Sequence, residues 1–192
     1  GTAAMTQTIT LSPAQIKRIA SRIDRPVVLV GLMGVGKSTV GRRLAAELAT
    51  DFVDVDHEIE RAADRTVSEI FTSHGEAYFR DGERRVIARL MDEAHGVIAT
   101  GGGAFVDDQT RSLIRERAIA IWLDCDIDTL VQRTAKRDTR PLLRGGDPRQ
   151  ILTELKDQRS GAYSEAHIHI VTNDGPHAET VQNILEAIDA WL

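Results

Sequence analysis

The chain has 192 residues, of which 42% are hydrophobic and 28% charged, a composition typical of one globular domain with a full-sized core. Its formal net charge of −5 argues against a nucleic-acid partner, because proteins that bind nucleic acid usually present a basic face. The first residues lack a signal-peptide pattern, no apolar run approaches the roughly 20 residues that cross a bilayer, and Cys125 is the single cysteine. We therefore expect a cytoplasmic monomer with small-molecule ligands and no membrane partner.

Residues 1–25 are predicted to lie outside the main domain. Gly1–Ala4 look like a scar left by cloning. Ser12–Asp24 is predicted to be a helix, because it starts with a capping serine and a first-turn proline and its isoleucines share a face. We expect this extra helix to cover one end of the sheet that follows.

Residues 26–192 alternate between strand-like and helical patterns, which predicts a single domain. The strand-like runs are Pro26–Gly31, Asp51–Asp56, Gly96–Thr100, Ala118–Asp124 and His167–Thr172. Most are dense in Val, Ile and Ala rather than alternating, as expected of strands buried on both faces. The clearest helical patterns are Arg42–Leu48, Glu76–Met91 and Pro148–Tyr163. The alternation predicts an α/β three-layer sandwich, with a five-stranded and mostly parallel sheet flanked by helices.

Residues 31–39 match the pattern G-x-x-x-x-G-K-[ST] in full, between a predicted strand and a predicted helix. The glycines let backbone N–H groups turn toward phosphates, and the positive end of the following helix adds to the attraction. Lys37 would reach the β- and γ-phosphates, and the Ser38 hydroxyl would bind Mg²⁺. The predicted ATP-binding residues of this P-loop are Gly34, Val35, Gly36, Lys37, Ser38 and Thr39.

The main alternative to a metabolic enzyme is a regulatory NTPase. A switch GTPase would carry D-x-x-G after its third strand and an N-K-x-D motif that reads guanine. No Asp in this chain has Gly three residues later, and Ala135 occupies the Asn place before Lys136-Arg-Asp138. The sequence therefore favours an enzyme over a switch.

Two carboxylates end the second predicted strand, at Asp54 and Asp56. Alternation along a strand would put them on one face, about 6–7 Å apart, facing the ligand crevice. One could then support Mg²⁺ through water while the other grips a substrate hydroxyl. The alternative is that both simply cap the following helix, predicted over His57–Ala63.

Six motifs in order resemble those of shikimate kinase, from about Pro26 to the C-terminus. They are Gly31–Thr39, Asp54-x-Asp56, Gly75-Glu-Ala-Tyr-Phe-Arg80-x-x-Glu83, Thr100-Gly-Gly-Gly103, Arg140-Pro-Leu-Leu143 and Arg159-x-x-x-Tyr163. The resemblance implies MgATP-dependent phosphorylation of the 3-hydroxyl of shikimate, in aromatic amino-acid biosynthesis. Gluconate kinase and nucleoside-monophosphate kinases are the alternatives within enzymes, because their acceptors also carry a carboxylate or phosphate.

For the acceptor, the resemblance implies that Asp56 holds the shikimate hydroxyls while Arg80 and Arg159 hold its carboxylate. Guanidinium forks suit that task because they bind a carboxylate bidentately. Glu83 lies three residues after Arg80 on a predicted helix and could hold its guanidinium in position. Three glycines, Gly101, Gly102 and Gly103, would let the backbone touch a flat ring directly.

For the nucleotide, the resemblance implies that Arg133 lies against adenine and that Arg140 approaches the phosphates. Arg140 belongs to a basic, glycine-hinged loop at about residues 134–148, which is either solvated surface or a mobile lid. The predicted catalytic residues are Lys37, Asp56 and Arg140. For Mg²⁺ we favour Ser38 and Asp54. The other candidates, Asp124 and Asp126, are predicted to cap a helix over Ile127–Arg137.

Overall fold

The structure is a computed structural model, and it describes residues 10–135 and 146–192. Within these residues lies one five-stranded sheet in the order β2-β3-β1-β4-β5, and every pairing is parallel. The strands are β1 (Val27–Val30), β2 (Phe52–Asp54), β3 (Val97–Ala99), β4 (Ile119–Cys125) and β5 (Ile168–Thr172). The predicted α/β fold and its parallel sheet are confirmed.

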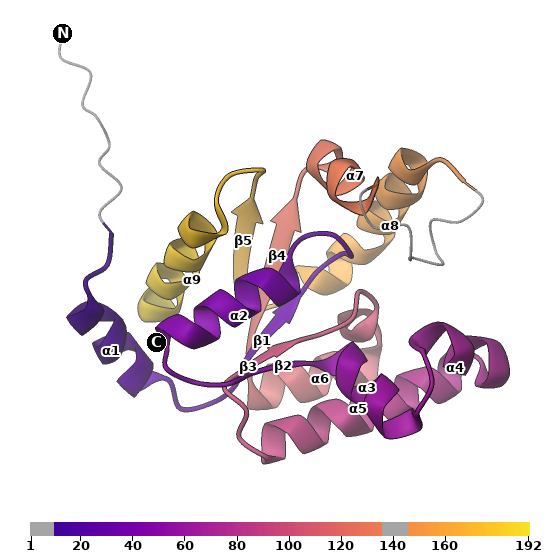
Figure 1. Ribbon diagram of the computed structural model, residues 1–192, viewed down its shortest axis with the longest axis horizontal. Coiled ribbons are helices and arrows are strands. Elements are labelled where there is room, and N and C mark those ends of the chain that lie inside the picture. The colour runs from indigo at the N-terminus through magenta and orange to yellow at the C-terminus, as the bar shows by residue number, and fades with distance from the viewer. Residues whose placement is uncertain (1–9, 136–145) are drawn as a thin grey trace, which may run out of the picture.

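Helices surround the sheet and extend beyond it (Figure 1). They are α1 (Pro13–Arg22), α2 (Lys37–Glu47), α3 (Val55–Ala63), α4 (Val67–His74), α5 (Glu76–Asp92), the 3-10 turn η1 (Ala104–Val106), α6 (Asp108–Arg117), α7 (Ile127–Ala135), α8 (Pro148–Tyr163) and α9 (His177–Trp191). Helix α2 lies on one face of the sheet and α6 on the other, as expected from the right-handed rule for parallel crossovers (Figure 1). Helix α9 returns beside α2 and packs on β5, while α7 and α8 pack together.

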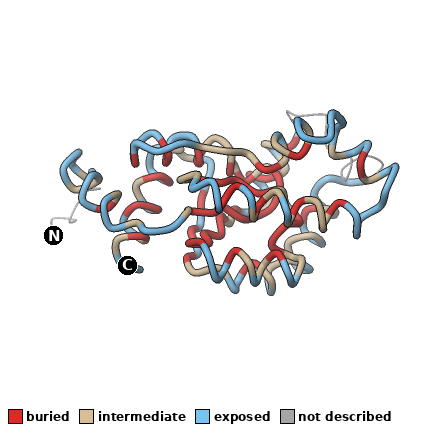
Figure 2. Tube along the Cα trace, turned by 90° about the horizontal axis from the view of Figure 1, so that it is seen from below, coloured by how far each residue is buried: buried red, intermediate tan, exposed pale blue. Residues whose placement is uncertain are grey.

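The core is centred on β1, whose four residues are fully buried. Figure 2 shows the buried positions concentrated in the middle of the molecule, where the strands lie between the helical layers. Strand β5 is at the edge of the sheet, and its burial alternates from residue to residue because only one of its faces is covered. The continuous apolar pattern of the inner strands and the mixed pattern of β5 follow from these positions.

The order of the strands creates a crevice at the carboxyl end of β1. From β1 the chain moves to β2 on one side of the sheet, and later crosses from β3 to β4 on the other side. In open α/β sheets, ligands bind outside the strand ends where the direction of winding reverses in this way. The glycine-rich loop of residues 31–36 follows β1 and therefore lies at this crevice.

The second strand is shorter than predicted, which changes the position of Asp56. Strand β2 ends at Asp54 and helix α3 begins at Val55, so Asp56 lies in the first helical turn. Asp54 is the N-cap of α3, and its carboxylate accepts a hydrogen bond from the His57 backbone N–H at 3.3 Å. The prediction that both carboxylates belong to the strand is wrong, because this cap starts the helix immediately after Asp54.

Helix α1 has the predicted capping serine but a different packing partner. Ser12 and Gln15 form a reciprocal capping box, in which each side chain accepts from the other residue's backbone N–H. The helix packs against α9, where Arg22 forms an ion pair with Asp189, and Ile19 is 1% exposed. It thus covers a helix at the edge of the molecule, and the prediction that it covers one end of the sheet is wrong.

Candidate active site

The loop between β1 and α2 has the backbone geometry that phosphate binding requires. Gly36 is the N-cap of α2 with φ of +98°, a conformation that residues with a side chain rarely adopt. Lys37 is 8% exposed, and its ammonium group donates to the carbonyl oxygens of Gly31 at 2.6 Å and Leu32 at 2.9 Å. The ammonium group and the N–H groups that begin α2 therefore face the same place, which is a strong anion site.

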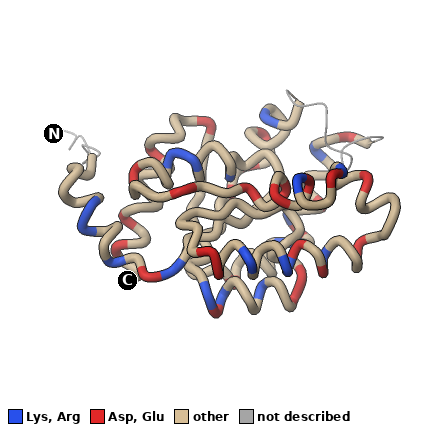
Figure 3. Tube along the Cα trace, turned by 60° about the horizontal axis from the view of Figure 1, so that its bottom comes forward, with Lys and Arg blue, Asp and Glu red and all other residues tan. Residues whose placement is uncertain are grey.

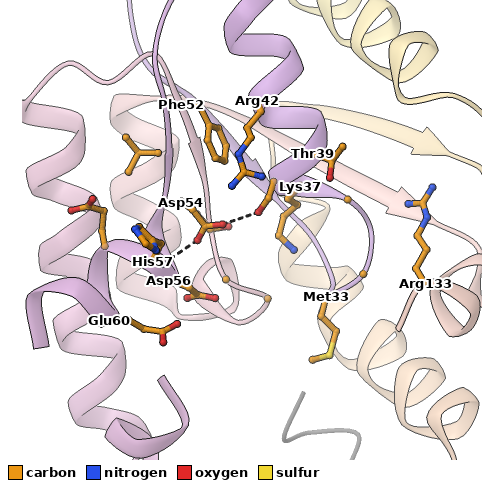
Figure 4. Close-up of a pocket in the computed structure, with 18 of the residues that line it drawn as sticks. Met33, Lys37, Thr39, Arg42, Phe52, Asp54, Asp56, His57, Glu60 and Arg133 are labelled. Atoms are coloured by element: carbon orange, nitrogen blue, oxygen red, sulfur yellow. Dashed lines mark hydrogen bonds between the residues drawn. The ribbon is translucent and has the colours of Figure 1, made fainter. Parts of the chain in front are cut away.

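A cavity of about 960 Å³ opens from this loop toward the ends of β2 and β3 (Figure 4). Of the residues predicted from the sequence, it is lined by Gly34, Gly36, Lys37, Ser38, Thr39, Asp54, Asp56, Gly101, Gly102 and Arg133. The predicted loop residue Val35 is buried and does not line the cavity. Its backbone carbonyl oxygen accepts a hydrogen bond from Arg133. Arg140 and the central part of the predicted lid, residues 136–145, lie outside the described residues.

Asp54 connects the phosphate-binding loop to the β2–α3 junction. The Ser38 hydroxyl donates to its Oδ2 atom at 2.7 Å, while its Oδ1 atom accepts from the His57 N–H. Figure 4 shows both hydrogen bonds at the Asp54 carboxylate, which lies between His57 and Lys37. The Asp54 carboxylate therefore caps a helix and also lies beside the Ser38 hydroxyl oxygen. Oxygen atoms of this kind are the ligands that Mg²⁺ prefers.

Asp56 points into the cavity from the first turn of α3. Burial raises the pKa of its carboxyl group, and the nearby Asp54 carboxylate raises it further, while Lys37 acts in the opposite direction. A raised pKa brings a carboxylate closer to the range in which it can accept a proton at neutral pH. Asp56 also faces Gly101, where a Cβ atom would lie 2.8 Å from its Oδ1.

The two glycines that follow lie against the two predicted substrate arginines in the same way. A Cβ atom on Gly102 would be 3.2 Å from Nη1 of Arg159, and one on Gly103 would be 2.1 Å from Nη2 of Arg80. These residues come from three separate helices, α3, α5 and α8, and meet at the turn after β3. The fold thus gathers one carboxylate and two guanidinium groups around a backbone that has no side chains of its own.

The Arg80 guanidinium is held in position by the buried carboxylate of Glu83. Its Nη1 atom lies 2.7 Å from Oε1 of Glu83, which is 1% exposed. Burial raises the pKa of Glu83 to about 7, although the Arg80 guanidinium opposes the shift. The guanidinium also lies 5.2 Å from the centre of the Phe79 ring and 5.8 Å from that of Phe71. The predicted pairing of Arg80 with Glu83 is present.

Arg159 has a buried donor aimed at the same turn. Among the described residues, its Nη1 atom has no hydrogen-bond partner although it is shielded from solvent. Four residues later on α8, the buried Tyr163 hydroxyl donates to the Gly102 carbonyl oxygen. Because buried donors are normally satisfied, the Arg159 guanidinium is suited to an anionic partner beside Gly102.

Arg133 lies on the other side of the loop, at the end of α7. Its guanidinium donates to the Val35 carbonyl oxygen at 2.8 Å and to the Asn173 carbonyl oxygen at 3.0 Å. His177, the first residue of α9, lines the cavity beside it, and burial together with the Arg133 charge lowers the pKa of this histidine. Arg133 therefore joins the phosphate-binding loop to the turn before α9, far along the chain from that loop.

Several cavity residues were not predicted from the sequence. They are Met33, Arg42, Phe52, Val53, His57, Glu58, Glu60 and Thr100. The Arg42 guanidinium lies 5.1 Å from the centre of the Phe52 ring at the rim of the cavity. Arg42 comes four residues after Ser38 on α2, so helical spacing could have placed it on the same face.

Two carboxylates at the end of β4, Asp124 in the strand and Asp126 just after it, have different roles. Asp126 accepts from the Thr129 backbone N–H at 3.0 Å and from the Thr129 hydroxyl at 2.8 Å, so the predicted capping of α7 is confirmed for it. Asp124 accepts instead from the Cys125 N–H at 2.9 Å and pairs with Lys156 and His169. The capping prediction is wrong for Asp124, because these contacts turn its carboxylate toward α8 and β5.

The overall fold and the sequence both match known proteins. The solved structure "Shikimate kinase from Acinetobacter baumannii in complex with shikimate" has a TM-score of 0.82 to this chain at 40% identity, covering 86% of this chain and 93% of that one. The family model described as shikimate kinase matches residues 33–189. The chain belongs to the shikimate kinase family.

Other shikimate kinases are similar over most of their length. The enzyme of Novosphingobium aromaticivorans is 58% identical over 95% of this chain and 96% of its own. That of Caulobacter vibrioides strain NA1000 is 56% identical over 85% and 82%, respectively. A gluconokinase from Sinorhizobium meliloti shares only the fold, with a TM-score of 0.57 at 16% identity.

Proposed function

We propose that this kinase transfers the γ-phosphoryl group of ATP to the 3-hydroxyl of shikimate, giving shikimate 3-phosphate in the pathway to the aromatic amino acids. One observation carries this proposal beyond family membership. Gly101, Gly102 and Gly103 lie against the side chains of Asp56, Arg159 and Arg80, respectively. A small, flat, hydroxylated carboxylic acid fits such a turn, because its ring can lie on bare backbone between charged groups.

The acceptor would be held at both of its polar ends. Arg80 and Arg159 would bind the carboxylate through their guanidinium forks, and Asp56 would accept a hydrogen bond from the hydroxyl group that attacks. The raised pKa of Asp56 supports a role in taking the proton of that hydroxyl as the new bond forms.

The donor would lie along the phosphate-binding loop. Backbone N–H groups of residues 34–39 and the Lys37 ammonium group would hold the phosphates in line with the acceptor. Arg133 would lie against the adenine, next to the turn that precedes α9. Arg140, outside the described residues, is proposed to add a positive charge near the transferred group, on a lid at about residues 134–148 that excludes water.

Mg²⁺ fits the oxygen pair formed by Ser38 and Asp54. Their 2.7 Å hydrogen bond brings a hydroxyl and a carboxylate together beside the loop, and Mg²⁺ commonly combines one or two protein oxygens with substrate phosphates and water. When bound, the ion would supply positive charge that neutralises the phosphates. We propose these two residues as its protein ligands, with Asp54 acting directly or through water.

We further propose that the enzyme is a cytoplasmic monomer. In the described part of the chain, no helix combines the length and the apolar character that a membrane span requires. Positions of Lys and Arg alternate with those of Asp and Glu along the described chain (Figure 3). Light scattering coupled to gel filtration tests this proposal: a mass near 21.1 kDa is expected, and twice that mass would contradict it.

A coupled assay of ADP release tests the function. The purified protein is given MgATP with shikimate, gluconate, AMP or no acceptor. Release that depends on shikimate alone is the expected result. Release with another acceptor would keep the kinase and discard the substrate, and release without any acceptor would instead favour a regulatory NTPase.

A further inference from the structure

Asp124, at the end of β4, belongs to a polar cluster that the proposed mechanism does not use. Its side chain is 17% exposed, and each of its oxygens has a partner. Oδ1 accepts from the Cys125 N–H at 2.9 Å and lies 3.5 Å from Lys156 Nζ, while Oδ2 lies 3.0 Å from His169 Nε2. The carboxylate is thus committed to neighbouring side chains on α8 and β5.

Lys156 attaches helix α8 to the end of the central sheet. Besides its pairing with Asp124, its ammonium group donates to the Cys125 carbonyl oxygen at 3.1 Å. The side chain is only 31% exposed, so solvent screens this pair less than a surface ion pair. This contact links α8 to the carboxyl end of β4, the strand that lies next to β1.

The residues of α8 that face the sheet include the one that reaches the acceptor site. Leu152, Lys156, Arg159 and Tyr163 follow the spacing of a single helical face. Leu152 and Tyr163 are 0% and 1% exposed, and Arg159 lies beside Gly102. Because Arg159 is less than one turn beyond Lys156, the contact that fixes Lys156 also fixes the height and rotation of the Arg159 backbone.

A second series of contacts joins the same cluster to the same glycine. The His169 ring stacks on Trp122 with centroids 4.0 Å apart and an angle of 9° between the planes. Trp122 in turn lies 5.7 Å from the ring of Tyr163, whose hydroxyl donates to the Gly102 carbonyl oxygen. The cluster is therefore connected to Gly102 both through α8 and through packed rings.

We propose that Asp124 and Lys156 are positioning residues for the acceptor site, which hold α8 so that the Arg159 guanidinium meets the acceptor carboxylate beside Gly102. This inference rests on the proposed function and deepens it. Bidentate binding of a carboxylate tolerates little displacement, since misplacing a binding group by about 1 Å can cost a large part of its effect. The same contacts make Asp124 an anchor for α8 rather than a ligand of Mg²⁺.

Lys156→Met tests the proposal, because it keeps most of the length of the side chain and removes its charge. We expect the shikimate KM, and the shikimate Kd from calorimetry, to rise by about tenfold, with the KM for ATP unchanged. Lys156→Arg, which retains a cation, should recover most of the affinity. Glu154→Gln is the matched control on the exposed face of α8, where only Gln150 contacts it among the interactions described, and it should leave all constants unchanged.

Asp124→Asn separates the anchor from a magnesium ligand. We expect it to reproduce the Lys156→Met phenotype, to leave the Mg²⁺ concentration for half-maximal activity unchanged, and to add nothing when combined with Lys156→Met. Wild-type shikimate affinity in both single variants would overturn the proposal. A raised Mg²⁺ requirement in Asp124→Asn with unchanged shikimate KM would also overturn it. Failure of the proposed function would show differently, because the wild-type enzyme itself would then neither bind nor phosphorylate shikimate.

Discussion

At the scale of single residues, the proposed acceptor site depends on the absence of a side chain at three glycines. Gly101, Gly102 and Gly103 each occupy a place where a Cβ atom would approach a charged side chain. The backbone of Gly103 has φ of −100°, which other residues adopt readily. At that position the need for glycine is steric rather than conformational, so a substitution there perturbs the site without straining the chain.

Gly103→Ala is accordingly expected to weaken acceptor binding. Its Cβ atom would lie 2.1 Å from Arg80 Nη2, so the guanidinium must move and lose alignment with the carboxylate. Steady-state kinetics should show the shikimate KM rising by about tenfold or more, with the KM for ATP unchanged. A wild-type shikimate KM would mean that Arg80 does not contact the acceptor.

The buried carboxyl group of Glu83 predicts a pH dependence of stability. Its pKa is about 7 in the folded protein and near 4.5 when unfolded, so between these values the folded state binds the extra proton. Stability from this group is therefore present below pH 4.5 and is lost as the pH rises to about 7, by up to roughly 3 kcal/mol.

Urea denaturation of the wild type and of Glu83→Gln at pH 5 and pH 8 measures this effect. The variant cannot ionise at this position, so it should not lose this stability as the pH rises. We therefore expect the free energy of unfolding of the variant, relative to that of the wild type, to be higher at pH 8 than at pH 5. Parallel changes in the two proteins would contradict the raised pKa.

At the scale of elements, helix α5 carries Arg80 and its partner Glu83, and it has a glycine in its interior. Gly82 lies between Arg80 and Glu83 on this helix, and a Cβ atom there would meet nothing within 4 Å. Gly82→Ala should therefore raise the free energy of unfolding by about 0.5–1 kcal/mol, because alanine loses less backbone entropy in a helix.

Gly41→Ala on α2 is the matched comparison for this prediction. Its Cβ atom would lie 2.5 Å from the Phe52 ring, so this second substitution should destabilise the protein. Urea denaturation of the two variants measures the contrast, and the same sign of change in both would contradict the packing described for these helices.

Helix α1 is expected to contribute stability rather than catalysis. It packs on α9 at the edge of the molecule, and its Ile19 side chain is buried. Ile19→Ala should lower the free energy of unfolding by about 2–4 kcal/mol in urea denaturation, and should leave both KM values unchanged where the protein is folded. A raised KM for ATP would instead indicate that α1 acts through α9 on His177.

At the scale of the whole molecule, a chain with a net charge of −5 binds anions by local concentration of positive groups. Lys37, Arg80, Arg133 and Arg159 come from four helices; Lys37 and Arg133 line the cavity, and the two other arginines lie at the glycine turn after β3. Most of the other arginines in the described ranges form ion pairs with nearby acidic residues, as at Arg84, Arg89 and Arg111. The molecule can therefore be acidic overall and still hold two anionic ligands.

Ligand binding should consequently stabilise the whole domain. At a shikimate concentration of 100 Kd, linkage adds about 2.7 kcal/mol to the free energy of unfolding, which a thermal-shift experiment detects as a higher Tm. The shift should be absent with gluconate and strongly reduced in Arg159→Ala. An equal shift in that variant would remove Arg159 from the acceptor site.

Much of the fold was predictable because its signals are local. The bounds of α8 were predicted without error, since Pro148 starts the helix and Tyr163 ends its apolar face. The five strands were recognised because buried parallel strands consist of short, continuous apolar runs. The boundary at Asp54 was missed, because one side chain that caps a helix ended the strand two residues early.

The sequence by itself determined the phosphate-binding loop, the alternation of strands and helices, and the residue types of the proposed acceptor site. All of these are encoded within short segments. Only the tertiary structure decided that Gly101, Gly102 and Gly103 lie against Asp56, Arg159 and Arg80, and that Asp124 holds Lys156 and His169. The physical reason is sequence separation: these partners are brought together by the winding of the sheet and the packing of α3, α5 and α8, and no local pattern records those contacts.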